Sequence, residues 1–222
     1  MDNIKKFVIN LKRRPDRLEA FQKNCPFDDV TVITAFDGKN IKDETSAIEQ
    51  ELVTRFTRLD PGEIGCFLSH LRVFNEIRRE NLPYAFIFED DAIFCNNFLE
   101  KYSKVMEELP SDTDILYIGG RFESQFKMRD FTMVSDNIVK HHIENNRLLG
   151  KSCDIDRTTH AYIVSNAFAT RFTEEFYKTM RHCQAIDSYL LAFSKVQGFT
   201  IYNSYPLLCH SPMRSDSDIR IH

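Results

Sequence analysis

The sequence predicts an α/β fold, in which helices pack against an open β-sheet. First, short apolar runs typical of buried strands alternate with longer amphipathic runs typical of helices. Second, the strand-like run Tyr84–Phe88 leads directly into three acidic residues. Third, the chain opens with a strand, a basic turn and a helix, as nucleotide-binding folds do. Ligands of such sheets bind at the carboxyl ends of the strands, so the acidic residues mark the expected site.

These three acids are Glu89, Asp90 and Asp91. Adjacent carboxylates repel one another, so stability alone does not favour them, and a divalent cation bound by oxygen ligands would offset the repulsion. In strand-like geometry Glu89 and Asp91 point to one side and Asp90 to the other. One side could then hold a metal and a phosphate while the other anchors the loop. The alternative interpretation is a solvated turn that follows a strand.

Composition restricts the classes of function. The 222 residues, with 42% hydrophobic and 28% charged, suit one globular domain spanning residues 1–222. A formal net charge of -4 gives no sign of a nucleic-acid-binding surface. No apolar run approaches the roughly 20 residues of a membrane span, and the start lacks a signal-peptide segment, so we expect a cytoplasmic protein. Six scattered cysteines without a C-x-x-C pattern favour a reduced chain over a zinc site.

Two strands are predicted at the start of the chain, over Phe7–Leu11 and Val30–Ala35. Asn10 and Arg13 follow the first strand, and Asp37 follows the second. Because successive strand ends converge on one crevice, we expect these three side chains to line a nucleotide pocket. The alternatives are a solvated basic face for Arg13 and a common Asp-Gly turn for Asp37.

A long helix is predicted before the acidic strand. Its start is marked by an N-cap acid, a first-position proline and a capping-box acid, which are Asp60, Pro61 and Glu63. Apolar residues then recur along one buried face. Gly65 and Ser69 on this helix are expected to border the nucleotide pocket, whereas His70 is interpreted as structural.

The second half of the chain continues the alternation of elements. The stretch from Arg121 to Asp156 shows no firm period and is interpreted as a long excursion or lid. The tail from Cys209 to Ile219 is polar and is expected to be irregular. The predicted helices are 98–109, 167–180 and 186–195, and the predicted strands are 114–120, 158–165 and 199–202.

Several of these stretches match one family together. They are Val8–Leu11 with Arg14–Arg17, Ala35–Gly38, Pro61–Leu71, Phe88–Asp91, Asp114–Gly119 and Thr159–Ser165. On these residues the sequence resembles glycosyltransferase family 25, which includes lipopolysaccharide and lipooligosaccharide galactosyltransferases and collagen galactosyltransferase domains. The resemblance covers nearly the whole chain, and the Gly-Glu-Ile-Gly-Cys helix followed by the acidic strand is its most specific part.

The resemblance implies a GT-A type fold, with a mixed, mostly parallel sheet flanked by helices. It also implies an inverting transfer of a sugar, galactose or glucose, from a UDP-sugar to a hydroxyl of a glycan or glycoprotein acceptor. The expected cofactor is Mn²⁺, with Mg²⁺ as the alternative. Glu89 and Asp91 occupy the outer positions of what looks like the family's D-x-D motif, and Thr159 and His160 belong to a matching strand.

Roles follow from this resemblance and from the strand geometry. Asp91 is expected to bind the metal directly, with Glu89 or Asp90 helping through water or the ribose. Thr159 and His160 are expected to bind the nucleotide sugar. The oligomeric state is not predicted.

Two further site residues are expected late in the chain. Asp187 resembles the family acid that follows the Thr-His-Ala-Tyr strand and is the expected catalytic base, although it also suits a helix start. Asp154 and Asp156 are the next candidates. His210 is expected to be a second metal ligand, and Arg214 to approach the diphosphate; the alternative is a frayed terminus.

Two other functions stay open at this point. A metal-dependent nucleotidyltransferase or phosphohydrolase would use the same acids without an acceptor sugar. A non-catalytic module would hold a nucleotide sugar without turning it over.

Overall fold

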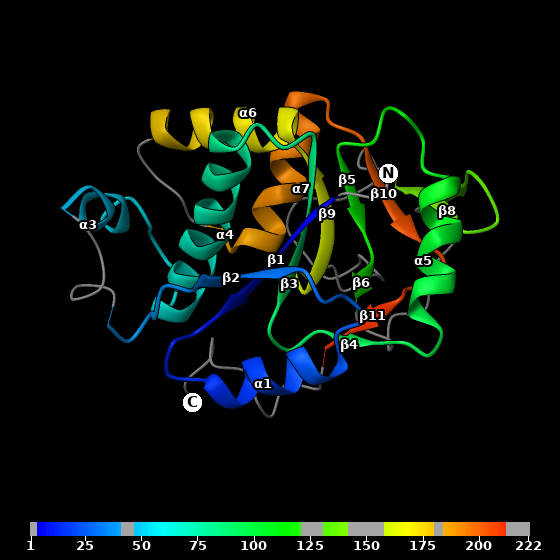
Figure 1. Cartoon of the computed structure of the whole chain (residues 1–222). Helices are drawn as coiled ribbons and strands as arrows, with labels where there is room; N and C mark the ends of the chain where they lie inside the picture. Colours follow the sequence, from blue (N-terminus) through cyan, green and yellow to red (C-terminus); the bar gives the residue numbers. More distant parts are fainter. Residues whose placement is uncertain (1–3, 41–46, 121–130, 142–157, 180–183, 212–222) are drawn as a thin grey trace.

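A mixed eight-stranded sheet forms the centre of the protein in this computed structural model, which describes residues 4–40, 47–120, 131–141, 158–179 and 184–211 (Figure 1). In the described residues the strand order is β2-β1-β3-β9-β5-β10-β8-β7. These strands are β1 (Lys5–Asn10), β2 (Val30–Thr34), β3 (Tyr84–Glu89), β5 (Ile115–Tyr117), β7 (Phe131–Met133), β8 (Ile138–His141), β9 (Ala161–Ser165) and β10 (Ile201–Ser204). The predicted α/β sheet flanked by helices is therefore confirmed.

Most strands of this sheet run in one direction. β1 pairs in parallel with both β2 and β3, and β5 pairs in parallel with β10. β9 is inserted between β3 and β5 and runs antiparallel to both. β8 is also antiparallel to its neighbours β10 and β7. The carboxyl ends of β1, β2 and β3 consequently meet at one edge, where the residues before β9 also arrive.

Helices cover both faces of the sheet. One face carries α4 (Pro61–Arg79), α6 (Asn166–Lys178) and α7 (Ile186–Gln197), which lie together in Figure 1. The other face packs against α1 (Pro15–Asn24) and α5 (Phe98–Glu107). A short helix, α3 (Ala47–Val53), precedes α4.

Strand β3 shows how the sequence pattern produces this layering. Ala85 and Ile87 pack into the core beneath α4, whereas Phe86 and Phe88 pack into the core on the α1 and α5 side. All four side chains are fully buried. A strand buried on both faces reads as a continuous apolar run, which is why this strand was recognised from the sequence.

The start of α4 is held as its sequence predicts. The backbone N–H of Asp60 donates to Glu63 Oε2 at 3.0 Å, which is one half of a capping box. Gly65 on this helix packs against the loop after β2, because a Cβ there would lie 2.6 Å from the carbonyl oxygen of Phe36. Only glycine allows this approach, so it fixes α4 against the carboxyl end of β2.

Two predictions about irregular segments are wrong over the residues that the structure describes, which are 131–141 and 209–211; the rest of both segments lies outside them. Within the stretch 121–156, β7 and β8 form a hairpin that extends the sheet, because Ile138 and Val139 are fully buried beside β10. In the tail, Cys209–His210 forms β11 between β4 (Ile93–Phe94) and β6 (Gly119–Gly120), making a second, three-stranded sheet.

The predicted strands 114–120 and 158–165 also differ in extent. The first divides into β5 and β6, which belong to different sheets, and the second begins only at Ala161. Thr159 and His160 are left in the turn that precedes β9. Among the described residues, no helix has the length and apolar character that a membrane span requires.

Candidate functional site

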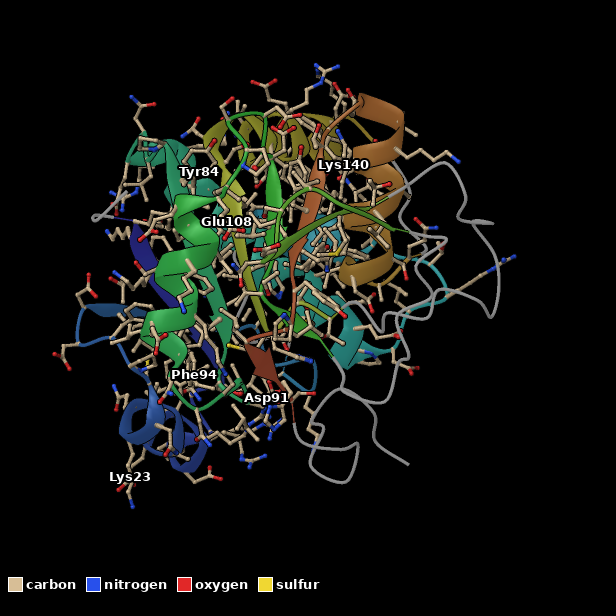
Figure 2. The ribbon with its side chains drawn as sticks, turned by 90° about the vertical axis from the view of Figure 1, so that its right-hand side faces the viewer. Lys23, Tyr84, Asp91, Phe94, Glu108 and Lys140 are labelled. Atoms are coloured by element: carbon tan, nitrogen blue, oxygen red, sulfur yellow. The ribbon has the colours of Figure 1, made fainter. Side chains whose placement is uncertain are left out.

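A cavity of about 180 Å³ opens at the carboxyl ends of β1, β2 and β3. Figure 2 shows Asp91 at the opposite end of the fold from Tyr84, where β3 begins, so the strand carries the acids to this edge. The residues that line the cavity come from β1, α1, the loop after β2, α4 and the acidic turn. They include Arg13, Arg17, Asp37, Lys39, Asp60, Cys66, Ser69, His70, Glu89, Asp90 and Asp91.

Asp90 faces α1 and anchors the acidic turn. Asn10 Nδ2 donates to Asp90 Oδ2 at 2.7 Å, and Arg17 Nη2 lies 2.7 Å from Asp90 Oδ1. The backbone N–H of Asp90 also donates to the carbonyl of Ile9 at 3.2 Å. Burial raises the pKa of Asp90 to about 6, although the Arg17 charge opposes this rise. Asn10, predicted to line the nucleotide pocket, holds this carboxylate and is not among the residues that line the cavity.

Glu89 faces α4, as the alternation along the strand predicts. The hydroxyl of Thr159 donates to Glu89 Oε1, and His70 Nε2 lies 3.3 Å from the same oxygen. The other ring nitrogen of His70 lies 2.9 Å from the hydroxyl of Tyr162, and His70 and Tyr162 are fully buried. Burial alone would raise the pKa of Glu89, but the imidazoles of His160 and His70 outweigh it and hold that pKa well below its usual range.

Asp91 and His160 complete a group of possible metal ligands with Glu89. One donor atom from each lies within 4.8 Å of the other two. In the described part of the chain, Asp91 Oδ1 and both ring nitrogens of His160 are buried without a hydrogen bond. Burying such atoms unpaired is costly, and a divalent cation would supply their missing partner. These residues therefore fit a bound cation, and burial together with the Glu89 charge raises the pKa of Asp91 in its absence.

Arg17 and His210 border this group. Arg17 Nη2 reaches Asp91 Oδ2 at 3.0 Å as well as Asp90, so one guanidinium holds both carboxylates. His210 lies in β11, paired with Ile93 of β4 just after the acidic turn. Burial lowers the pKa of His210, and His160 lowers it further.

The far end of the cavity is built around Asp37. Arg13 Nε donates to Asp37 Oδ2 at 2.6 Å, and the backbone N–H of Lys39 donates to Asp37 Oδ1 at 3.0 Å. Ser69 Oγ accepts from the backbone N–H of Phe36 at 2.9 Å and donates to the carbonyl of Gly65 at 2.6 Å. Arg13, Asp37 and Ser69, three of the residues predicted to line a nucleotide pocket, thus line this cavity, while Gly65 packs against the loop that forms part of its wall.

Asp187 lies in the first turn of α7, where its Oδ1 accepts from the backbone N–H of Ser188 at 2.7 Å. Burial raises the pKa of Asp187, and the charges of Glu89 and Glu63 raise it further. Helix α7 packs on the face of the sheet that carries α4, and Asp187 is not among the residues that line the cavity. Arg214, Asp154 and Asp156 lie outside the described residues.

Sequence reasoning missed three residues of the site. His70 was interpreted as structural, and Tyr162 and Cys66 were given no role, yet His70 joins Tyr162 to Glu89 and Cys66 lines the cavity. The spacing of Cys66 and His70 by four residues on one helix was an available signal that both face the same way.

Comparison with known proteins gives one family and several relatives. The model of the family described as Glycosyltransferase family 25 (LPS biosynthesis protein) matches residues 3–190. Procollagen galactosyltransferase 1 of Danio rerio is 34% identical over 125 residues, covering 51% of this chain and 21% of that protein. Inactive glycosyltransferase 25 family member 3 of Homo sapiens is 32% identical over 127 residues, again covering 51% of this chain and 21% of that protein.

The match thus spans about a fifth of the length of the procollagen galactosyltransferases. One solved structure, that of the inositol-1-phosphate CTP transferase from T. maritima, matches with a TM-score of 0.45 and 11% sequence identity. The match covers 98% of this chain and 92% of that one.

Proposed function

The chain belongs to glycosyltransferase family 25, and from this premise we propose that residues 1–222 form one hexosyltransferase domain. It transfers galactose or glucose from a UDP-sugar, with inversion, to a hydroxyl of a glycan or glycoprotein acceptor. The reaction depends on a divalent cation, Mn²⁺ in the first place and Mg²⁺ as the alternative. Relatives named procollagen galactosyltransferases support the choice of donor and reaction.

The observation that carries this proposal is the group formed by Glu89, Asp91 and His160 at the edge of a cavity. Its donor atoms converge within 4.8 Å, and three of its buried polar atoms have no hydrogen-bond partner among the described residues. A protein rarely leaves such atoms unpaired unless an ion or ligand satisfies them. When bound, the cation would neutralise the diphosphate of the donor.

The cavity also supplies charges for the rest of the donor. Arg13, Arg17 and Lys39 line it together, so positive side chains surround the space beside the acids. Arg17 already holds Asp90 and Asp91, but a guanidinium has five N–H donors and can reach a phosphate oxygen as well. Asp37, held by Arg13 at the end of β2, is placed to accept hydrogen bonds from the ribose or base.

Transfer also requires a group that takes the proton of the acceptor hydroxyl. We assign this role to Asp187, whose helix α7 packs on the α4 face of the sheet, opposite the face that carries α1 and Arg17. Its raised pKa suits a general base, because a more basic carboxylate accepts a proton more readily. A base on the face of the sugar away from the leaving diphosphate is what inversion demands.

A relative named inactive favours one alternative, a module that binds the nucleotide sugar without turnover. Both functions predict cation-dependent binding of UDP, so binding is tested first and release of UDP separates the two. A nucleotidyltransferase or phosphohydrolase would instead act without any acceptor sugar.

The test is calorimetric titration of UDP with Mn²⁺ and with a chelator, in the wild type and in Asp91→Asn. We expect tight binding only with Mn²⁺ and a loss of that dependence in the variant. Asp16→Asn is the matched control, because Asp16 makes the same kind of carboxylate–arginine pair, with Arg14, on the exposed side of α1. Equal UDP affinity with and without Mn²⁺ in the wild type would contradict the proposal.

A further inference from the structure

Helix α4 presents a second set of donor atoms to Glu89, distinct from the group with Asp91 and His160. Cys66 and His70 are one turn apart on this helix, so they share the face turned toward the sheet. One atom each of Cys66, His70 and Glu89 lies within 4.8 Å of the other two. Cys66 and His70 both line the cavity, so an ion entering the cavity can reach them.

The spacing of these atoms fits a small tetrahedral ion. Zinc binds imidazole nitrogen and carboxylate oxygen at about 2.0–2.1 Å, so two such ligands at the tetrahedral angle stand about 3.3 Å apart. His70 Nε2 and Glu89 Oε1 are 3.3 Å apart. A thiolate binds zinc at about 2.3 Å, which puts the sulfur about 3.6 Å from each of the others. Cys66 Sγ needs to move inward by no more than about 1.2 Å from the 4.8 Å limit to reach that position.

The chemistry of the donors separates this set from the first one. Thiolate, imidazole and carboxylate together are typical zinc ligands, whereas Asp91 with Glu89 adds a second oxygen and suits Mn²⁺ or Mg²⁺. We propose that Cys66, His70 and Glu89 form a second metal site, selective for Zn²⁺ and similar thiophilic ions. Because Glu89 belongs to both sets, zinc at this site removes a ligand from the other and inhibits the enzyme. Only the inhibition rests on the proposed function; the binding of zinc does not.

Binding of one zinc ion at this site releases one proton from the protein. Burial and the surrounding carboxylates, Glu89 first among them, raise the pKa of Cys66, so the metal-free protein carries a thiol whose proton leaves to solvent when zinc binds. An imidazole that binds zinc through Nε2 keeps its proton on Nδ1, and in His70 that N–H would donate to the hydroxyl oxygen of Tyr162, which lies 2.9 Å away. Tyr162 thereby becomes the outer partner that orients a metal-bound imidazole.

Cobalt absorption tests the site without any assay of turnover. Co²⁺ takes the place of Zn²⁺, and a cobalt–thiolate bond gives a near-ultraviolet charge-transfer band that oxygen and nitrogen ligands do not give. We expect this band in the wild type and in Asp91→Asn, a marked loss of it in Cys66→Ala, and its decline when Mn²⁺ is added in excess. Cys95→Ser is the matched control, because Cys95 lies in the loop between β4 and α5 and is not among the residues that line the cavity. An identical band in the wild type and in Cys66→Ala would overturn the proposal.

Zinc inhibition is measured next, each variant being compared with its own rate in Mn²⁺ alone. Cys66→Ala removes a direct zinc ligand. Because loss of an outer partner of a ligand already lowers metal affinity about tenfold or more, the half-inhibitory zinc concentration should rise at least about tenfold in this variant. Cys95→Ser should respond like the wild type. Equal zinc sensitivity in all three proteins would also overturn the proposal. If no turnover is found at all, the proposed function fails while the cobalt spectra still decide the site.

Discussion

Tyr162→Phe is expected to weaken both the fold and the binding of the divalent cation. The change removes one hydroxyl from a fully buried side chain and leaves His70 Nδ1, 2.9 Å away, without its partner. An unsatisfied buried group costs about 1–3 kcal/mol. For a chain of this length about 2 kcal/mol corresponds to a fall in Tm of about 4–8 °C.

The effect on metal binding has a separate cause. The Tyr162 hydroxyl holds the His70 ring through Nδ1, and His70 Nε2 in turn lies 3.3 Å from Glu89 Oε1. His70 is thus an outer partner of the metal ligand Glu89, and disturbing such a partner typically lowers metal affinity about 10–100-fold. We therefore expect Mn²⁺ affinity, measured by calorimetry on the variant well below its Tm, to fall at least about tenfold.

Tyr202→Phe is the matched control for this prediction. The Tyr202 hydroxyl donates to Asp112 Oδ1 at 2.9 Å, but Tyr202 packs into the core on the α1 and α5 side. This variant should lose a little stability and keep the Mn²⁺ affinity of the wild type. If Tyr162→Phe lowers Tm yet binds Mn²⁺ like the wild type, Tyr162 and His70 are structural and do not position Glu89.

Three further predictions concern single acidic or basic groups. Burial raises the pKa of Asp90 from 3.8 to about 6, so ionisation of Asp90 opposes folding as the pH rises through that range. Relative to Asp90→Asn, the metal-free wild type should therefore lose about 3 kcal/mol of unfolding free energy between about pH 4 and about pH 6. A stability difference independent of pH in denaturant titrations would contradict this. Asp187→Asn should lower turnover about 10²-fold or more with little change in UDP affinity, and unchanged steady-state turnover would leave Asp187 as a helix-terminal acid alone. His210→Ala should weaken Mn²⁺ binding while leaving the Tm of the metal-free protein nearly unchanged, and an unaltered Mn²⁺ affinity would remove His210 from the site.

The sequence was sufficient for the elements that are long or buried on both faces. Strand β3 and helix α4 carry strong local signals, an unbroken apolar run in one and a capping box with a helical period in the other. The hairpin of β7 and β8 and the two-residue strand β11 carry none, because their pairing depends on β10 and on β4 and β6. Short strands of this kind exist only through partners distant in sequence, which local patterns do not reveal.

In the candidate site, too, some contacts follow from local sequence patterns and others depend on residues distant in the chain. Strand geometry predicted opposite sides for Glu89 and Asp90, and the structure places Asp90 against Arg17 and Glu89 against His70. Asp91 lies beyond the end of β3, in the turn, and contacts Arg17 as Asp90 does. The contact between His70 and Tyr162 spans 92 residues and depends on the register of β3 against β9. Neither residue type nor spacing indicates such a register before the sheet is known.

The most direct test of the central claim is release of UDP from a panel of UDP-sugars, measured with Mn²⁺ and with a chelator, in the wild type and in Asp91→Asn. The account predicts release from UDP-galactose or UDP-glucose only with Mn²⁺, stimulated by an acceptor hydroxyl, and none above background in Asp91→Asn. Release that is equal with and without Mn²⁺, or undiminished in Asp91→Asn, would contradict the claim that Glu89, Asp91 and His160 form a metal-dependent transferase centre.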